Sequence, residues 1–237
     1  HIWPGEASTC LRAFKKFIDD IRPAAVILNG DVLDFPQISR HPPIGWESHP
    51  SVKEEIEAAQ DHLDDIVKAS RRAKKLWLLG NHDARLETRL ASVAPEFKGM
   101  KGLHLHEHFG LWARGWSCRI NENVEGGDTF VKHRLAGGKH APRTNVERAG
   151  VSIVTGHLHS QKVTPMSNYR PFDFYGVDTG CVADKDHKAF NYTEDAPLDW
   201  RSGFAVLTYR EGRLLPPELV TKWSDDQVVF RGSVIKC

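Results

Sequence analysis

Hydrophobic residues in the first half of the chain follow two spacings, one helical and one continuous. Apolar side chains three or four residues apart predict three amphipathic helices. Their apolar positions are Leu11, Phe14, Ile18 and Ile21, then Val52, Ile56, Ala59, Leu63 and Val67, and finally Leu86, Leu90 and Val93. Continuous apolar runs at 24–28 and 76–79 predict two short buried strands. Ser8, and the capping box of Ser51 and Glu54, are typical starts for the first two helices.

The second half of the chain shows the patterns of β-structure. Residues 102–120 alternate with period two and residues 126–127 are a Gly-Gly turn signal, which predicts mixed or antiparallel pairing. His104, His106 and His108 would share one face of such a strand, and we expect that face to be solvated rather than to bind a metal. Further apolar runs predict strands at 151–154, 174–177 and 204–209. Helices and strands in alternation indicate an α/β protein.

Side chains able to bind metals follow three of the predicted strands. They are Asp31 and Asp34, then Asn81, His82 and Asp83, and later His157 and His159, with His133 between the last two groups. In α/β proteins the carboxyl ends of strands carry the loops that bind ligands. Carboxylate, amide and imidazole groups suit divalent transition metals. The sequence therefore predicts a metal site at a strand edge, next to a helix N-terminus that favours anions.

Each of these groups also has a simpler structural explanation. Asp31 and Asp34 are common turn residues, residues 80–83 fit a capped strand-to-helix turn, and a single His133 is typical of a surface. The two histidines of the sequence GHLH are more suggestive of a ligand pair. Only the occurrence of all the groups in order, each at a strand end, makes a metal site the better interpretation.

Composition narrows the functional classes. The chain has 237 residues, of which 40% are hydrophobic and 27% charged, as expected of one globular domain with a proper core. Its formal net charge of +1 argues against avid binding to duplex nucleic acid, although a local basic patch remains open. The sequence has no apolar run of membrane-spanning length and no charged-then-apolar leader, so we expect a cytoplasmic protein without a membrane partner. The 4 scattered cysteines are expected to be reduced thiols.

The motifs GDVLD, GNHD, a lone His133 and GHLH, in this order, resemble the signature of the calcineurin-like metallophosphoesterase superfamily over roughly residues 1 to 181. In that pattern the first motif is Asp-x-His, and His1 stands where its histidine would fall. The Asp and the first strand would then lie upstream of the given sequence. Arg134 follows His133, where many members have glycine. The stretches GNHDARLETRLASVAPEF, GCVAD and WRSGFAVL are similar to small bacterial and phage-encoded members.

The resemblance implies a fold and a pair of metal ions. The fold would be a four-layer α-β-β-α sandwich with two mixed sheets, formed by residues 1–237 as a single domain. The metals would be two divalent transition ions, with Mn as the first choice and Fe, Zn, Ni or Co as alternatives. One ion would be bound by His1, Asp31, His159 and the upstream Asp, and the other by Asp31, Asn81, His133 and His157.

The resemblance also implies roles around the metals. His82 would act on the substrate as a proton donor or by stabilising charge, with Asp83 orienting it, while Asp34 would orient metal ligands through hydrogen bonds. Arg85 and Lys139 are candidates for contacts with the substrate phosphate. The function would be hydrolysis of phosphate mono- or diesters by attack of a metal-bound hydroxide. A DNA or RNA nuclease of the same superfamily is the alternative enzyme, and an inactive scaffold with the same fold is the alternative outside enzymes.

Overall fold

The computed structural model describes residues 1–41, 46, 48–187, 190, 193 and 198–237. These residues form two compact units, and the chain crosses between them more than once. The first unit comprises residues 1–7, 15–115 and 186–196, and the second comprises 8–14, 116–185 and 197–237.

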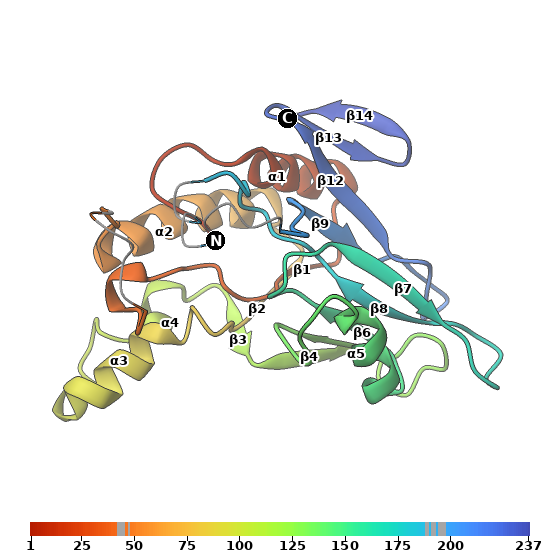
Figure 1. Ribbon diagram of the computed structural model, residues 1–237, viewed down its shortest axis with the longest axis horizontal. Coiled ribbons are helices and arrows are strands. Elements are labelled where there is room, and N and C mark those ends of the chain that lie inside the picture. Colours follow the sequence, from red (N-terminus) through yellow and green to blue (C-terminus); the bar gives the residue numbers. More distant parts are fainter. Residues whose placement is uncertain (42–45, 47, 188–189, 191–192, 194–197) are drawn as a thin grey trace. The chain divides into compact units, whose positions relative to one another are not determined.

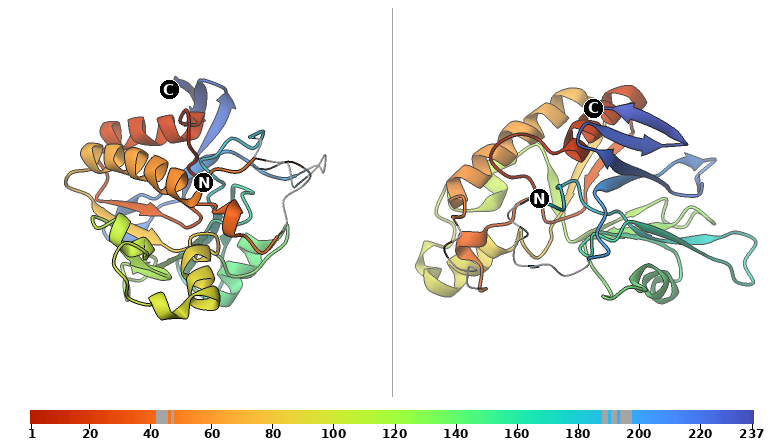
Figure 2. Two further views of the ribbon diagram at one scale, coloured as in Figure 1. Left: turned by 90° about the vertical axis from the view of Figure 1, so that its left-hand side faces the viewer. Right: turned by 45° about the horizontal axis from the view of Figure 1, so that its top comes forward.

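The first unit is built on a three-stranded parallel sheet with the order β1-β2-β3. Its elements are β1 (Ala25–Leu28), the 3-10 helix η1 (Pro36–Ile38), α2 (Val52–Ala69), β2 (Lys74–Leu78), α3 (Arg85–Val93), the 3-10 helix η2 (Pro95–Phe97), α4 (Leu105–His108) and β3 (Ala113–Gly115). Both Figure 1 and Figure 2 show α2 along one face of this sheet. Its side chains Leu63 and Ile66 are buried, as is Trp77 of β2. This packing leaves the carboxyl ends of β1 and β2 side by side, with Leu28 paired to Trp77.

The second unit contains a five-stranded mixed sheet with the order β4-β5-β6-β8-β7 and an antiparallel sheet with the order β14-β13-β12-β9. Its elements are β4 (Ser117–Ile120), β5 (Thr129–Lys132), α5 (Ala141–Ala149), β6 (Ser152–Thr155), β7 (Lys162–Met166), β8 (Phe174–Asp178), β9 (Gly203–Val206), β10 (Tyr209–Arg210), β11 (Arg213–Leu214), β12 (Glu218–Ser224), β13 (Gln227–Phe230) and β14 (Ser233–Lys236). Strands β10 and β11 form a separate hairpin.

Helix α5 packs directly on the mixed sheet, as Figure 2 shows from two sides. Val146 of α5 forms a buried cluster with Ile153 of β6 and Phe174 of β8. The approach is so close at Gly176 that an added Cβ would lie 1.9 Å from the carbonyl oxygen of Pro142. A glycine on β8 therefore lets the helix cover the sheet, in which β5, β6 and β8 run parallel and β7 runs antiparallel.

The predicted helix starts are confirmed. Helix α1 (Thr9–Ile21) follows Ser8, whose hydroxyl oxygen accepts a hydrogen bond from the backbone N–H of Leu11. Helix α2 begins after Ser51 with the predicted capping box, in which Ser51 and Glu54 each bind the other's backbone N–H. The four prolines of residues 35–50 predict a loop in that segment, of which residues 42–45 and 47 lie outside the described residues.

The prediction of strands throughout 102–120 is wrong in its first half. Residues 105–108 form the short helix α4, and strands occur only at 113–115 and 117–120. Glu107 is the physical reason, because its carboxylate accepts hydrogen bonds from the backbone N–H groups of Gly102 and His104 and so closes a turn. The alternation of His and Leu over five residues is too short to separate a strand from one turn of helix.

The expected fold class, α/β with a mixed sheet, is confirmed. The sheet of the first unit is parallel in all its described strands rather than mixed. The face-to-face arrangement of two sheets and the single domain over residues 1–237 stay predictions. Among the described helices, none combines the length and the apolar composition needed to cross a membrane.

Candidate metal centre

The loops after β1 and β2 are held together by the carboxylate of Asp83. Its Oδ2 accepts hydrogen bonds from the backbone N–H groups of Asp31 at 2.9 Å and Gly80 at 2.8 Å, and from the indole of Trp77 at 3.0 Å. Its Oδ1 accepts from the backbone N–H of Leu33 at 3.1 Å. Asp83 is completely buried, and this burial, with the nearby charge of Asp31, raises the pKa of its carboxyl group. Asp83 is thus the structural link between the two motif loops.

Gly80 allows these loops to approach each other. A Cβ at this position would lie 2.0 Å from Oδ1 and 2.4 Å from the backbone nitrogen of Asp31. Both are distances that no side-chain carbon can occupy. The first residue of the GNHD motif must therefore lack a side chain for Asp31 to take its place.

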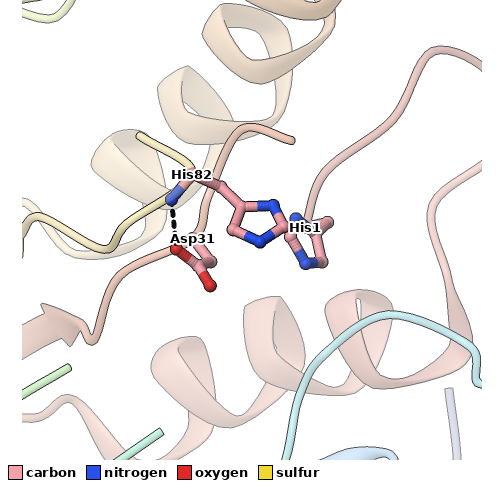
Figure 3. Close-up of side chains that lie close together, drawn as sticks. All are labelled: His1, Asp31 and His82. Atoms are coloured by element: carbon pink, nitrogen blue, oxygen red, sulfur yellow. Dashed lines mark hydrogen bonds between the residues drawn. The ribbon is translucent and has the colours of Figure 1, made fainter. Parts of the chain in front are cut away.

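Three predicted functional side chains of the first unit form one cluster. His1, Asp31 and His82 each offer a ligand atom, and these atoms lie within 4.8 Å of one another. Figure 3 shows the two imidazole rings beside the Asp31 carboxylate, with the backbone N–H of His82 donating to Asp31 Oδ1 at 2.9 Å. The ring centroids of His1 and His82 are 4.9 Å apart. The N-terminal segment is placed by the backbone N–H of Ile2, which donates to the carbonyl oxygen of Val32.

The side chain of Asn81 fits a metal ligand. Its Oδ1 is buried and has no hydrogen-bond partner within the described part of the chain. Leaving a buried amide oxygen unsatisfied costs free energy unless something else binds it. Together with the buried carboxylate of Asp31, this oxygen places two hard donor atoms after the carboxyl ends of β1 and β2. Divalent ions bind to donors of this kind.

His82 is oriented by Asp34. The ring Nδ1 of His82 lies 2.5 Å from Oδ1 of Asp34. Asp83 was expected to have this role, and the structure corrects that expectation: the Asp83 carboxylate is occupied by backbone amides and Trp77 instead. Sequence adjacency favoured Asp83, whereas the fold brings Asp34 in from the other loop.

Glu55 is a buried residue of this region that the sequence analysis did not identify. It lies on α2 with no exposed surface, and its Oε2 accepts hydrogen bonds from the backbone N–H groups of Asp34 at 3.0 Å and Phe35 at 2.9 Å. Burial raises the pKa of the Glu55 carboxyl group to about 7. Its position four residues before Ala59, on the apolar stripe of α2, was the available signal, because a charged residue rarely occupies a buried stripe without a specific partner.

In the second unit, His133 and His157 form a pair at the ends of parallel strands β5 and β6. Nε2 of His133 lies 3.2 Å from Nδ1 of His157, and their rings meet edge to face. Two imidazole nitrogens that bind one ion at about 2.0–2.1 Å lie about 3 Å apart, so this spacing fits a shared ion. His159 is buried near Trp200, with a ring separation of 4.7 Å.

Several predicted ligands have an unusual backbone conformation. The φ angles of Asp31, His157 and His159 are 52°, 67° and 56°, in the left-handed region. For residues other than glycine this conformation costs on the order of 1 kcal/mol each. Such conformations cluster at functional sites, although other residues here adopt them as well: Arg22, Phe35, Asn121, Asn123, Gln161, Glu211 and Arg231. The three residues were all predicted as metal ligands from the sequence.

Asp178 supports the GHLH loop from inside the second unit. It ends β8, is completely buried, and accepts hydrogen bonds from the hydroxyl of Ser160 and the backbone N–H of Gly180. Burial raises the pKa of its carboxyl group. Asp178 thus resembles Asp83, since each is a buried carboxylate that holds the loop carrying predicted ligands. Its place at a strand end was visible in the sequence, but its partners were not.

Lys139 and a second histidine cluster complete the set of candidate residues. Lys139, a predicted phosphate contact, is exposed in the second unit, and that role stays a prediction. Glu87, His104 and His106 also offer ligand atoms within 4.8 Å of one another. However, His104 Nε2 accepts the backbone N–H of Gly99, so its Nδ1 carries the proton and donates to Glu87 at 3.0 Å. A metal would need that nitrogen unprotonated, which favours a purely structural role.

Comparison with known proteins identifies the family. A model of the calcineurin-like phosphoesterase family matches residues 1–200. The chain therefore belongs to the calcineurin-like phosphoesterase family, as its motifs predicted. Membership supports metal-dependent hydrolysis of phosphate esters as its general activity.

The individual proteins that match the chain share less than a third of their aligned residues with it. The gene 54 protein of Mycobacterium phage D29 is 27% identical over 229 residues, and the gene 54 protein of Mycobacterium phage L5 is 28% identical over 240 residues. Each alignment covers 89% of this chain and 86% of the relative. Among solved structures, Vps29 from Entamoeba histolytica, crystallised as a single mutant, is similar with a TM-score of 0.43 and 12% identity, over 99% of this chain and 91% of that chain.

Proposed function

We propose that the chain is a phosphoesterase that uses two divalent transition-metal ions to hydrolyse a phosphate mono- or diester. The observation that carries the proposal is the cluster of His1, Asp31 and His82 at the carboxyl ends of β1 and β2. The unsatisfied oxygen of Asn81 belongs to the same loop as His82. The metal ligands proposed for the enzyme are His1, Asp31 and Asn81 in the first unit, and His133, His157 and His159 in the second unit. Manganese is the first ion to test.

The ions and the protein would divide the work. When bound, divalent ions supply Lewis acidity, which polarises phosphoryl oxygens and makes a coordinated water more acidic. The protein's part is to hold the ligands before substrate arrives. Asp83 fixes the two loops, and the backbone N–H of His82 donates to Oδ1 of Asp31.

His82 is proposed to act on the substrate. Because its Nδ1 is bound to Asp34, its Nε2 is the atom that would give a proton to the leaving-group oxygen or stabilise charge on the phosphoryl group. This requires Nε2 to carry a proton and to exchange its contact with Nη2 of Arg85 for one with the substrate. Asp34 holds the ring by one nitrogen and is itself held by Glu55 through its backbone N–H. The acid or electrostatic step therefore depends on the loop that follows β1.

A substrate panel tests the proposed function. The purified protein is assayed with an aryl phosphomonoester, an aryl phosphodiester, a cyclic nucleotide and single-stranded DNA, each with manganese and with a chelator. We expect at least one ester to be hydrolysed with manganese and none with the chelator. Binding of manganese without hydrolysis of any of the four would contradict the enzyme assignment and favour a scaffold.

A further inference from the structure

Arg85 connects both motif loops of the first unit. It is the first residue of α3, directly after the GNHD loop. Its Nη1 donates hydrogen bonds to the backbone carbonyl oxygen of Asp34 at 2.6 Å and to Asp34 Oδ1 at 3.2 Å. Its Nη2 lies 3.2 Å from Nε2 of His82. One side chain thus contacts both partners of the Asp34–His82 pair.

These contacts define which nitrogen of His82 carries the proton. A guanidinium group only donates hydrogen bonds, so Nε2 of His82 must be the acceptor of its bond with Arg85. The ring proton is then on Nδ1, where it is donated to Asp34. Arg85, Asp34 and His82 form a closed ring of hydrogen bonds in which the charged groups of Arg85 and Asp34 strengthen each contact.

We propose that Arg85 is a positioning residue that fixes the imidazole of His82 for its work on the substrate. The proposal rests on the phosphoesterase function proposed above. The terminal torsion of a histidine side chain is broad, so a ring held at one nitrogen can still turn. In the free protein, contact at both nitrogens, from Asp34 on one side and Arg85 on the other, fixes the plane of the ring, and substrate would replace Arg85 at Nε2 while the ring keeps its orientation.

The geometry favours positioning over the direct contact with phosphate that the sequence predicted for Arg85. The shortest bond of the guanidinium, at 2.6 Å, is to a backbone carbonyl oxygen of the loop after β1. Its side chain is 20% exposed and that of Asp34 is 9% exposed, so the contact is largely shielded from water. A residue that acts through orientation lowers kcat when it is removed, whereas loss of a uniform substrate contact raises KM.

The kinetic test uses Arg85→Ala, Arg85→Lys and the control Arg89→Ala, an exposed arginine one turn further along α3. We expect Arg85→Ala to lower kcat by about 10- to 100-fold with little change in KM, the scale of a small misplacement of a reacting group. Arg85→Lys retains the charge but has a single nitrogen, so it should restore only part of the loss. Arg89→Ala should behave as wild type. A rise in KM without a fall in kcat would overturn the proposal.

A double-mutant cycle with His82→Ala shows whether Arg85 acts through His82. If it does, Arg85→Ala should cost less than about twofold in the His82→Ala background, because the group it positions is already absent. Effects of the two substitutions that simply multiply would overturn the proposal and indicate an independent role for Arg85.

A measurement on metal-free protein separates this proposal from the proposed function. Nitrogen-15 NMR follows the Nδ1 proton of His82 and its exchange with water. In Arg85→Ala the ring loses its hydrogen bond at Nε2 and turns more readily away from Asp34. We expect exchange of the Nδ1 proton to be about tenfold faster there, the factor for loss of one hydrogen bond of ordinary strength. Exchange should be unchanged in Arg89→Ala. Equal exchange in wild type and Arg85→Ala would overturn the positioning role. This result does not depend on hydrolysis, so a failed substrate panel leaves it intact.

Discussion

Nδ1 of His82 lies 2.5 Å from Oδ1 of Asp34, although the two residues are 48 positions apart in the sequence. The carboxylate of Asp83, the immediate neighbour of His82, is bound by three backbone N–H groups and the indole of Trp77. The two acidic residues therefore have different tasks. Asp34 orients the side chain proposed to act on the substrate, and Asp83 holds the loops that carry it.

Replacing His82 by alanine should slow the reaction and leave the metals in place. A positioned acid typically contributes about 100- to 10,000-fold in rate, so a loss in that range is expected. If His82 protonates the leaving oxygen, an ester with a good leaving group should lose less than one with a poor leaving group. Steady-state kinetics on both esters, with metal analysis of the variant, measure this.

The control for this prediction is His106→Ala, which removes an exposed histidine of the same unit. It should retain wild-type turnover. An equal loss for both esters in His82→Ala would point to charge stabilisation rather than proton transfer, and normal turnover would exclude His82 from the reaction.

Replacing Gly80 by alanine should displace Asp31. The added Cβ would lie 2.0 Å from the Asp31 carboxylate, and relief of such overlap costs about 1–3 kcal/mol in a tightly packed region. We expect a lower free energy of unfolding and weaker metal binding, measured by chemical denaturation and by metal titration. Gly110→Ala is the matched control, because its Cβ would have no neighbour within 4 Å. Equal behaviour of the two variants would refute the close-approach argument.

Glu55 should make stability depend on pH. Its pKa is raised from 4.5 to about 7 in the folded protein, so the folded state binds the proton more tightly than the unfolded state. The stabilising contribution is complete below pH 4.5 and is lost as pH rises through about 7. At 1.36 kcal/mol per pKa unit, the change is on the order of 3 kcal/mol.

The measurement is the free energy of unfolding of wild type and Glu55→Gln at pH 5 and pH 8. Glutamine does not titrate, so the fall in stability between these pH values should be smaller in the variant. Glu57→Gln, at a more exposed position on the same helix, should keep the wild-type dependence. A variant whose stability falls as steeply as that of wild type would show that Glu55 titrates normally.

Much of this architecture follows from local patterns in the sequence. The caps at Ser8 and Ser51 and the strands that precede the GDVLD, GNHD and GHLH motifs depend on neighbours only a few residues away, and the structure places them as expected. Local patterns also failed where they were short, as in residues 105–108, where a one-turn helix replaced the predicted strand.

The partners within the site could not be predicted in the same way. Asp83 binds the backbone of Asp31 across 52 positions, and Glu55 binds that of Asp34 across 21. Backbone N–H groups occur at every residue except proline, so the sequence gives no sign of which of them a buried carboxylate will bind. Motifs can thus indicate which side chains carry the chemistry, while the residues that hold them become visible only in the folded chain.

The most direct test of the account is the metal content and hydrolytic activity of Asp31→Asn beside wild type and Asp61→Asn, an exposed aspartate on α2. Asparagine keeps the size of the side chain but removes the charge proposed to bind the ions. We predict that Asp31→Asn binds less manganese at equilibrium and has no measurable turnover, while Asp61→Asn matches wild type in both. Near-normal turnover by Asp31→Asn with a full complement of manganese would contradict the account.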